Sequence, residues 1–248
     1  MTHRHPLCAL ETFWGEEVAT SWLEIGPLAL PSGAVVAGDP FTLLSDDVKP
    51  FAPTIEPGGY PVRLVLGHYF VPKDPEQTDG VMVEDLRVGL AVLCLGDGVP
   101  VRWENAMPAG VGPLPEDEVW CYLVNSGSGA FIDAATLPLL HQRYQEDSDF
   151  VQHLVDAVQA HYQPTYDWAD VVLDAETRAN MITFATYGGD SQSASYWGIA
   201  ADGQRICLVT DFDAFDLEAW QALDGRWFDL LEGRRGNLHQ PPFASAEC

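Results

Sequence analysis

The sequence predicts an α+β fold: a mostly antiparallel or mixed central sheet with helices from the middle third packed on it. Apolar, strand-like runs lie before and after the middle of the chain, whereas helical periodicity is concentrated between residues 134 and 162. Two Asp-Gly pairs lie between apolar runs, which is typical of β-hairpins. Strands followed by helices and then by further strands indicate the α+β class.

The strands expected before the helices are apolar runs bounded by turn residues. Residues 56–61 are rich in glycine and proline and predict a turn, because Gly supplies a positive φ and Pro fixes its own φ. The run 86–95 is apolar on both strand faces, which suits a central strand covered on both sides. Residues 73–80 are polar and unpatterned, so a surface loop is expected there. The predicted strands are residues 33–44, 62–71, 86–95, 99–103 and 119–124.

The two Asp-Gly pairs predict two hairpins, because a type I′ turn needs a positive φ at both central residues. The first, at Asp97-Gly98, would join the run 86–95 to the run 99–103. The second, at Asp202-Gly203, would join residues 195–200 to residues 204–210.

Helical periodicity marks two segments of the middle third, residues 134–145 and residues 149–162. In the second segment apolar residues recur every three to four positions, a stripe wide enough to pack on a core. Shorter helical stretches are expected at 217–223 and 226–231.

A single globular domain is expected over residues 1–248, because neither a Pro/Ser-rich linker nor a repeated period divides the chain. Its core is expected over about residues 20–232. The final residues 236–248 contain a Pro-Pro pair and predict a loose tail.

The chain is strongly acidic, with 12 Lys and Arg against 37 Asp and Glu, a formal net charge of −25. This balance argues against nucleic acid as a partner, since a protein that binds phosphates needs a basic surface. The charge is spread along both halves of the chain. Two interpretations stay open: a solvated surface that keeps the protein soluble, and attraction to a basic partner protein.

Cysteine usage and hydropathy predict a cytoplasmic protein with no membrane span. The five cysteines are odd in number and contain no CxxC pair, and three lie in apolar runs, as reduced core thiols do. Charged residues interrupt every apolar run well before a membrane-spanning length of about 18 residues. Phosphate-loop, dinucleotide-binding, HExxH and GxSxG motifs are absent, so no catalytic residue, metal or cofactor is predicted.

A first candidate ligand site follows the apolar run that ends at Val124. Successive backbone amides in a small, glycine-rich turn can form an anion-binding concavity, and a carboxylate follows. The alternative is a tight turn in which Asp133 caps the next helix. The candidate residues are Asn125, Ser126, Gly127, Ser128, Gly129 and Asp133.

A second candidate ligand site lies in residues 187–198, where a glycine pair and small polar residues precede two aromatics. Asp190 would supply a carboxylate, and Tyr196 and Trp197 would form stacking walls. The alternative is an ordinary hairpin loop whose aromatics pack into the core. Asp211 would join Asp133 and Asp190 in a carboxylate cluster if the fold brought them together.

Several short motifs occur in a fixed order along the chain, and together they resemble a bacterial family known as domain of unknown function 4241. The resemblance extends from about residue 30 to residue 212 and implies a single bacterial domain, but no known reaction. Asn125 stands where the family usually has Asp. The matching motifs begin at Leu30-Pro-Ser-Gly33 and Pro57-Gly-Gly-Tyr-Pro-Val62, continue with Arg102-Trp103-Glu104 and Asn125–Gly129, and end with Tyr196-Trp197-Gly198 and Leu208–Phe212.

Two functions are consistent with these features. The first is a non-catalytic acidic interaction module, of the immunity-protein or regulator type, that binds a basic partner protein. The second is a small-molecule binder, or a carboxylate- or metal-assisted hydrolase, that uses the glycine-rich loops 125–133 and 187–198. Both hypotheses leave the substrate, the partner's identity and the oligomeric state open.

Overall fold

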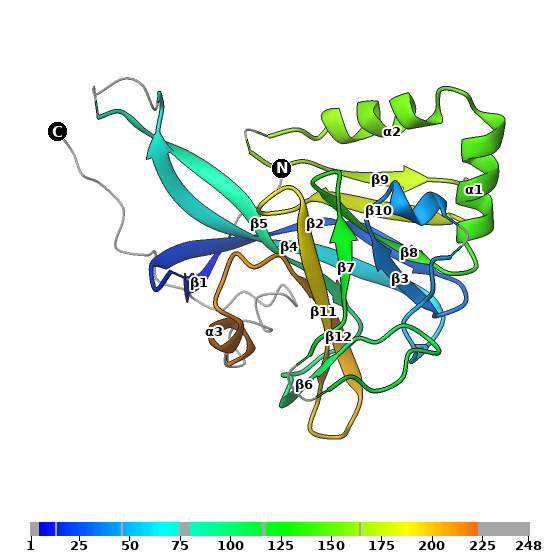
Figure 1. The fold of residues 1–248 in the computed structure, drawn as a ribbon, viewed down its shortest axis with the longest axis horizontal. Helices are drawn as coiled ribbons and strands as arrows, with labels where there is room; N and C mark the ends of the chain where they lie inside the picture. Colours follow the sequence, from blue (N-terminus) through cyan, green and yellow to red (C-terminus); the bar gives the residue numbers. More distant parts are fainter. Residues whose placement is uncertain are drawn as a thin grey trace.

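Two antiparallel β-sheets packed face to face form the centre of the molecule (Figure 1). The computed structural model describes six stretches of the chain: residues 5–12, 14–45, 47–74, 80–115, 118–163 and 165–222. Within these stretches the chain forms twelve strands, three short α-helices and one 3-10 helix.

The larger sheet has eight strands in the order β1-β2-β4-β5-β12-β11-β6, and β7 also pairs with β11. All of the pairs are antiparallel. The strand bounds are β1 His5–Glu11, β2 Glu17–Leu30, β4 Gly58–Pro72, β5 Met82–Cys94, β6 Arg102–Asn105, β7 Cys121–Val124, β11 Ser191–Ile199 and β12 Arg205–Asp211.

The smaller sheet has four antiparallel strands in the order β3-β8-β10-β9. Both faces of its central strand β8 are buried, because successive side chains of a strand point to opposite faces. Phe131 packs between the two sheets, and the next residue, Ile132, packs under the helices. The strand bounds are β3 Val35–Gly38, β8 Ser128–Asp133, β9 Trp168–Val172 and β10 Asn180–Ala185.

The helices cover the outer faces of the two sheets. The helices α1 (Leu137–Glu146) and α2 (Phe150–Gln159), with η1 (Thr42–Leu44), pack on the smaller sheet. The short helix α3 (Leu217–Gln221) places Trp220 on the outer face of the larger sheet. None of the helices in the described part of the chain is long and apolar enough to cross a membrane.

The predicted α+β class is wrong, because the molecule is a β-rich fold built on two sheets rather than on one helix-covered sheet. The helices expected at 134–145 and 149–162 exist as α1 and α2, but they cover only one face of the smaller sheet. The error arises from strands that alternate weakly or hold polar residues, such as β2, β8, β9 and β10, which the sequence pattern did not identify. The stretches 226–231 and 236–248 lie outside the described residues.

One of the two predicted hairpins is confirmed. β11 and β12 pair across Asp202-Gly203. The hairpin at Asp97-Gly98 is wrong, because β5 pairs with β12 and the strand after the turn, β6, pairs with β11. β12 fits the position beside β5, in the middle of the larger sheet, because both of its faces are buried. In the predicted strand 99–103, by contrast, Val99 and Val101 are exposed.

The β4–β5 hairpin extends beyond the rest of the larger sheet. Tyr69–Pro72 of β4 pair only with Met82–Asp85 of β5 among the described residues, since β2 reaches β4 only as far as His68 and β12 reaches β5 only as far as Leu90. These two segments form a two-stranded projection, here called the arm. Figure 1 shows the arm standing away from both sheets.

Candidate functional site

The two glycine-rich turns singled out in the sequence contact each other. The turn from β7 to β8 passes from the larger sheet to the smaller one, and the turn from β10 to β11 passes back. Thr186 joins them: its amide and its hydroxyl both donate to the carbonyl of Gly127, at 3.0 and 3.1 Å, and the hydroxyl also contacts the carbonyl of Gly189 at 3.0 Å. The fold therefore places both turns at one corner of the molecule.

The backbone amides of the first turn bind a carboxylate that belongs to the protein itself. The amides of Asn125 and Ser126 both donate to Oδ2 of Asp39 at 2.8 Å. Oδ1 of Asp39 accepts a third amide, that of Phe41, at 2.8 Å. Asp39 is only 1% exposed. The expected anion-binding turn is thus present, but an internal carboxylate occupies it.

The other candidates of the first motif have structural contacts. Ser128 and Gly129 lie in β8 and pair with β10. Asp133 is fully buried and accepts the amide and hydroxyl of Ser32 and the amide of Ala135, at 3.0, 2.7 and 2.7 Å. It does not cap α1, whose N-cap residue is Thr136. Asp133 instead fastens the connection between β2 and β3 to the end of β8.

The two aromatics of the second motif lie on opposite faces of β11. Tyr196 packs on the outer face of the larger sheet, with its ring 5.9 Å from that of Trp220. Trp197 packs between the sheets, with its ring 6.0 Å from that of Phe51. Neighbouring residues of a strand point in opposite directions, so these two rings do not line one pocket.

The structure does not gather the three candidate carboxylates into a cluster. Asp133 ends β8 in the smaller sheet, Asp190 is exposed in the turn before β11, and Asp211 ends β12 in the larger sheet. Asp211 accepts the indole N–H of Trp220 and the amide of Asp213, both at 2.9 Å. Burial raises the pKa of Asp211 to about 7. Its carboxyl group therefore holds α3 against the sheet.

A hydrogen-bonded relay at the base of the arm was not anticipated from the sequence. Nε2 of His68 lies 2.7 Å from the hydroxyl of Ser21, and Nδ1 lies 2.7 Å from a carboxylate oxygen of Glu84. Hydroxyl, imidazole and carboxylate occur in this order in serine hydrolases. Here, however, Ser21 lies within β2 and is 1% exposed, so its hydroxyl is not presented to a substrate. No local spacing predicts this relay, because its residues come from three strands.

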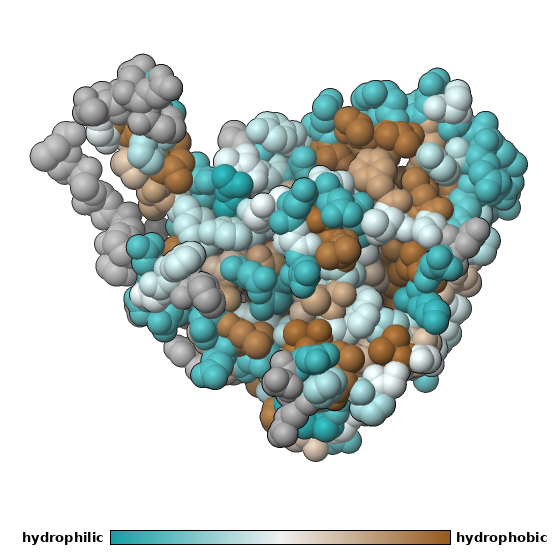
Figure 2. All heavy atoms as spheres, in the orientation of Figure 1, coloured by the Kyte–Doolittle hydropathy of each residue, from teal (hydrophilic) through white to brown (hydrophobic). Residues whose placement is uncertain are grey.

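Large apolar side chains are exposed at the arm. Phe70 is 66% exposed and Met82 is 51% exposed. Phe70 of β4 pairs with Glu84 of β5, and Met82 of β5 pairs with Pro72 of β4. Figure 2 shows apolar residues on the projection at the upper left, apart from the body of the molecule. The exposed apolar residues at the arm, here called the arm patch, are Phe70, Val81, Met82 and Val83.

The fold and these contacts define a β-rich, two-sheet protein whose glycine-rich turns bind its own side chains. Residues 28–210 match the family described as Protein of unknown function (DUF4241), and the chain belongs to this family. The resemblance found in the sequence is thereby confirmed. No curated protein and no solved structure matches the chain.

Proposed function

We propose that this chain is a non-catalytic, acidic, cytoplasmic module that binds a basic protein, and that the arm patch is its contact surface. The observation that carries the proposal is the exposure of four large apolar side chains at one projecting element, with Phe70 and Met82 on one face of the two-stranded arm and Val81 and Val83 on the other. Apolar residues scattered singly over a surface are ordinary, whereas a projecting element that exposes large apolar side chains on both of its faces indicates a site of interaction.

Charge indicates the chemistry of the partner. A net charge of −25 attracts a basic protein and accelerates its encounter at low ionic strength. On the arm itself, Glu84 is exposed opposite Phe70 and lies beside the apolar patch. An apolar centre with a polar, charged rim is the usual anatomy of a protein interface. This combination supports a partner of the kind that immunity proteins and regulators bind.

Contacts within the protein occupy the candidate groups of the first loop, 125–133, on which the alternative function depends in part. A hydrolase at the loops 125–133 and 187–198 would need free amides and a carboxylate facing a substrate. The amides of Asn125 and Ser126 are bonded to Asp39, and Asp133 is enclosed by Ser32 and Ala135. The three cysteines whose state is described, Cys94, Cys121 and Cys207, form no disulfide, which suits a reducing compartment.

The proposal is tested by co-purification from the native host at low salt, with the arm altered. The double variant Phe70→Ser with Met82→Ser removes the apolar centre of the patch. We expect the wild-type chain to retain a basic protein and the double variant to lose it. Replacing Phe70 with a photo-crosslinking benzoylphenylalanine should join that same protein to the arm.

The matched control is Val101→Ser, because Val101 is 66% exposed, as Phe70 is, but lies outside the arm. This control should retain the partner as the wild type does. The complex should weaken as salt is raised, since ions screen charge attraction. Retention of the same proteins by the wild type and the arm variant, or the absence of a partner at any ionic strength, would contradict the proposal.

A further inference from the structure

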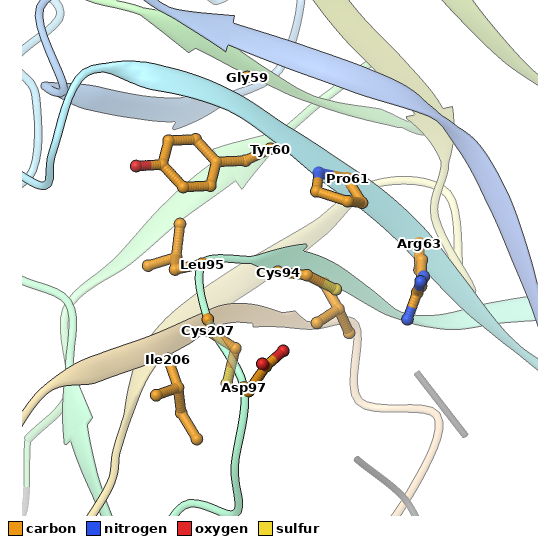
Figure 3. A pocket seen from close by; sticks show the side chains of 11 residues that line it. Gly59, Tyr60, Pro61, Arg63, Cys94, Leu95, Asp97, Ile206 and Cys207 are labelled. Atoms are coloured by element: carbon orange, nitrogen blue, oxygen red, sulfur yellow. The ribbon is translucent and has the colours of Figure 1, made fainter. Parts of the chain in front are cut away.

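A hollow of about 400 Å³ opens on the larger sheet, away from the arm, where the start of β4, the end of β5 and the start of β12 meet. Figure 3 shows Arg63 at one side of this hollow and Tyr60 at the other, with Cys94 and Leu95 between them. Pro61, Val92, Ile206 and Cys207 add further apolar lining. Asp97 also lines the hollow, so its lining combines apolar side chains with one cation, Arg63, and one carboxylate.

The side chain of Arg63 is only 9% exposed, which is unusual for a charged side chain. Nε of Arg63 donates to a carboxylate oxygen of Glu24 at 3.0 Å, and the guanidinium lies 4.9 Å from the ring centroid of Trp22. These two contacts fix the plane of the guanidinium. Its two Nη groups make no hydrogen bond to a protein atom in the described part of the chain.

A buried guanidinium with free Nη donors is suited to hold a carboxylate. The planar fork of arginine matches the two oxygens of a carboxylate, and such charge-assisted pairs are stronger than neutral hydrogen bonds. The apolar lining provided by Val92, Ile206 and Cys207 would take up the hydrocarbon part of the same molecule. We infer that this hollow binds a small organic carboxylate with an apolar body, and that Arg63 recognises its carboxylate group.

The high negative charge of the protein does not oppose this recognition at physiological salt. Charges further apart than a Debye length, about 8 Å at about 0.15 M salt, are largely screened. The charged groups that decide binding are therefore the near ones. Two carboxylates are near: Glu24, which is bonded to the guanidinium and competes with the ligand for it, and Asp97, which lines the hollow.

The inference is tested by titration calorimetry with 3-phenylpropionate, a carboxylate with a compact apolar body. The comparison ligand is 3-phenylpropanol, which has a similar shape but no charge. We expect the wild-type protein to bind the carboxylate at least tenfold more tightly than the alcohol. Arg63→Gln should abolish this preference, since it removes the cation that distinguishes the two ligands.

Two substitutions separate a binding role of Arg63 from a purely structural one. Glu24→Gln removes the competing carboxylate and should tighten the binding of 3-phenylpropionate severalfold, whereas Arg63→Gln weakens it. Gly59→Val adds bulk at the hollow, where a new Cβ meets no atom within 4 Å, and should block both ligands while Arg63 is unchanged. Gly112→Val, also in open space but outside the hollow, is the matched control and should bind as the wild type does.

Circular dichroism of each variant establishes that it is folded before it is titrated. The inference is overturned if wild-type protein gives no saturable binding of 3-phenylpropionate, or if it binds the alcohol equally well. It is also overturned if Gly59→Val and Gly112→Val bind the carboxylate alike. A result of this kind would leave the proposed protein partner unaffected, because the arm patch and the hollow share no residue.

Discussion

At the scale of single residues, three buried carboxylates hold chain connections in place. Asp39 binds three backbone amides, two of them from the turn after β7. Asp133 binds Ser32 and Ala135, and Asp211 binds the indole of Trp220. A buried carboxylate is costly unless donors surround it, so these groups are stable only where the fold supplies those donors. Two of them, Asp39 and Asp211, lead to specific predictions.

Asp39→Ala should destabilise the protein by about 3 kcal/mol, because it leaves three amides without their acceptor in a site closed to water. Asp39→Asn should cost less, since the amide oxygen still accepts. Urea unfolding measures both changes. Asp190→Ala, at an exposed position of the neighbouring turn, should shift the unfolding free energy by no more than about 0.5 kcal/mol. Equal effects of Asp39→Ala and Asp190→Ala would refute the role given to Asp39.

Asp211 should make stability fall as the pH rises through the weakly acidic range. Its pKa is raised from 3.8 to about 7, so the folded protein keeps a proton that the unfolded chain has already released. Between these two values the folded state binds the extra proton, and its stability decreases by about 1.4 kcal/mol for each pH unit. Above the folded pKa both states are ionised and the dependence ends.

The variant Asp211→Asn carries no such proton and isolates this effect. We expect the unfolding free energy of the wild type, minus that of Asp211→Asn, to fall by roughly 2 kcal/mol between about pH 5 and about pH 7. Urea unfolding at several pH values measures this difference. The same subtraction with Asp190→Asn provides the baseline for an exposed carboxylate. A difference that stays constant with pH would mean that the buried carboxyl group is ionised throughout.

At the scale of elements, the segment between β12 and α3 anchors the base of the arm. Phe215 is 2% exposed and packs on two glycines, Gly67 of β4 and Gly89 of β5. The amide of Asp216 donates to the carbonyl of Glu11 in β1 at 2.7 Å. These contacts, with the relay of Ser21, His68 and Glu84 on neighbouring strands, fix the place where the arm leaves the sheet.

Gly89→Ala should destabilise the protein by about 2 kcal/mol, because a Cβ at this position would overlap the ring of Phe215. Adding Phe215→Leu makes room for the methyl group and should recover part of the loss. Thermal unfolding of the single and double variants measures the coupling. Gly59→Ala, where a Cβ meets nothing within 4 Å, is the control and should change little. No coupling between positions 89 and 215 would argue against this packing.

Apolar periodicity predicted individual elements better than their pairing. α1 and α2 were identified because apolar residues recur with helical spacing in each of them. Leu140 of α1 and Leu154 of α2 are among those that are buried. The hairpin of β11 and β12 was identified from its Asp-Gly turn. The other Asp-Gly turn gave the wrong partner, because turn chemistry reports a reversal of the chain and not which strand lies beside β5. β8 was interpreted as a loop, because glycine and serine begin it.

At the scale of the whole molecule, two sheets share one apolar core, and each carries a second core on its outer face. Leu28 and Leu208 of the larger sheet meet Phe131 and Phe184 of the smaller one. The smaller sheet is buried on both faces, one against the larger sheet and the other under the helices. For this reason a fold with short helices still has a large buried interior. Among the described residues, the buried charged side chains are Asp39, Arg63, Asp85, Asp133 and Asp211; the other charged groups are at least partly exposed and govern encounters with partners rather than the fold.

The sequence by itself determined the acidity, the two longer helices, the second hairpin and the membership in the family. These properties depend on composition, on local periodicity or on motifs read in order. Only the tertiary structure decided that Asp39 occupies the amides of the first turn, that Tyr196 and Trp197 face apart, and that Arg63 lines a hollow. The physical reason is that these arrangements depend on strand register and sheet packing, which join residues far apart in the chain.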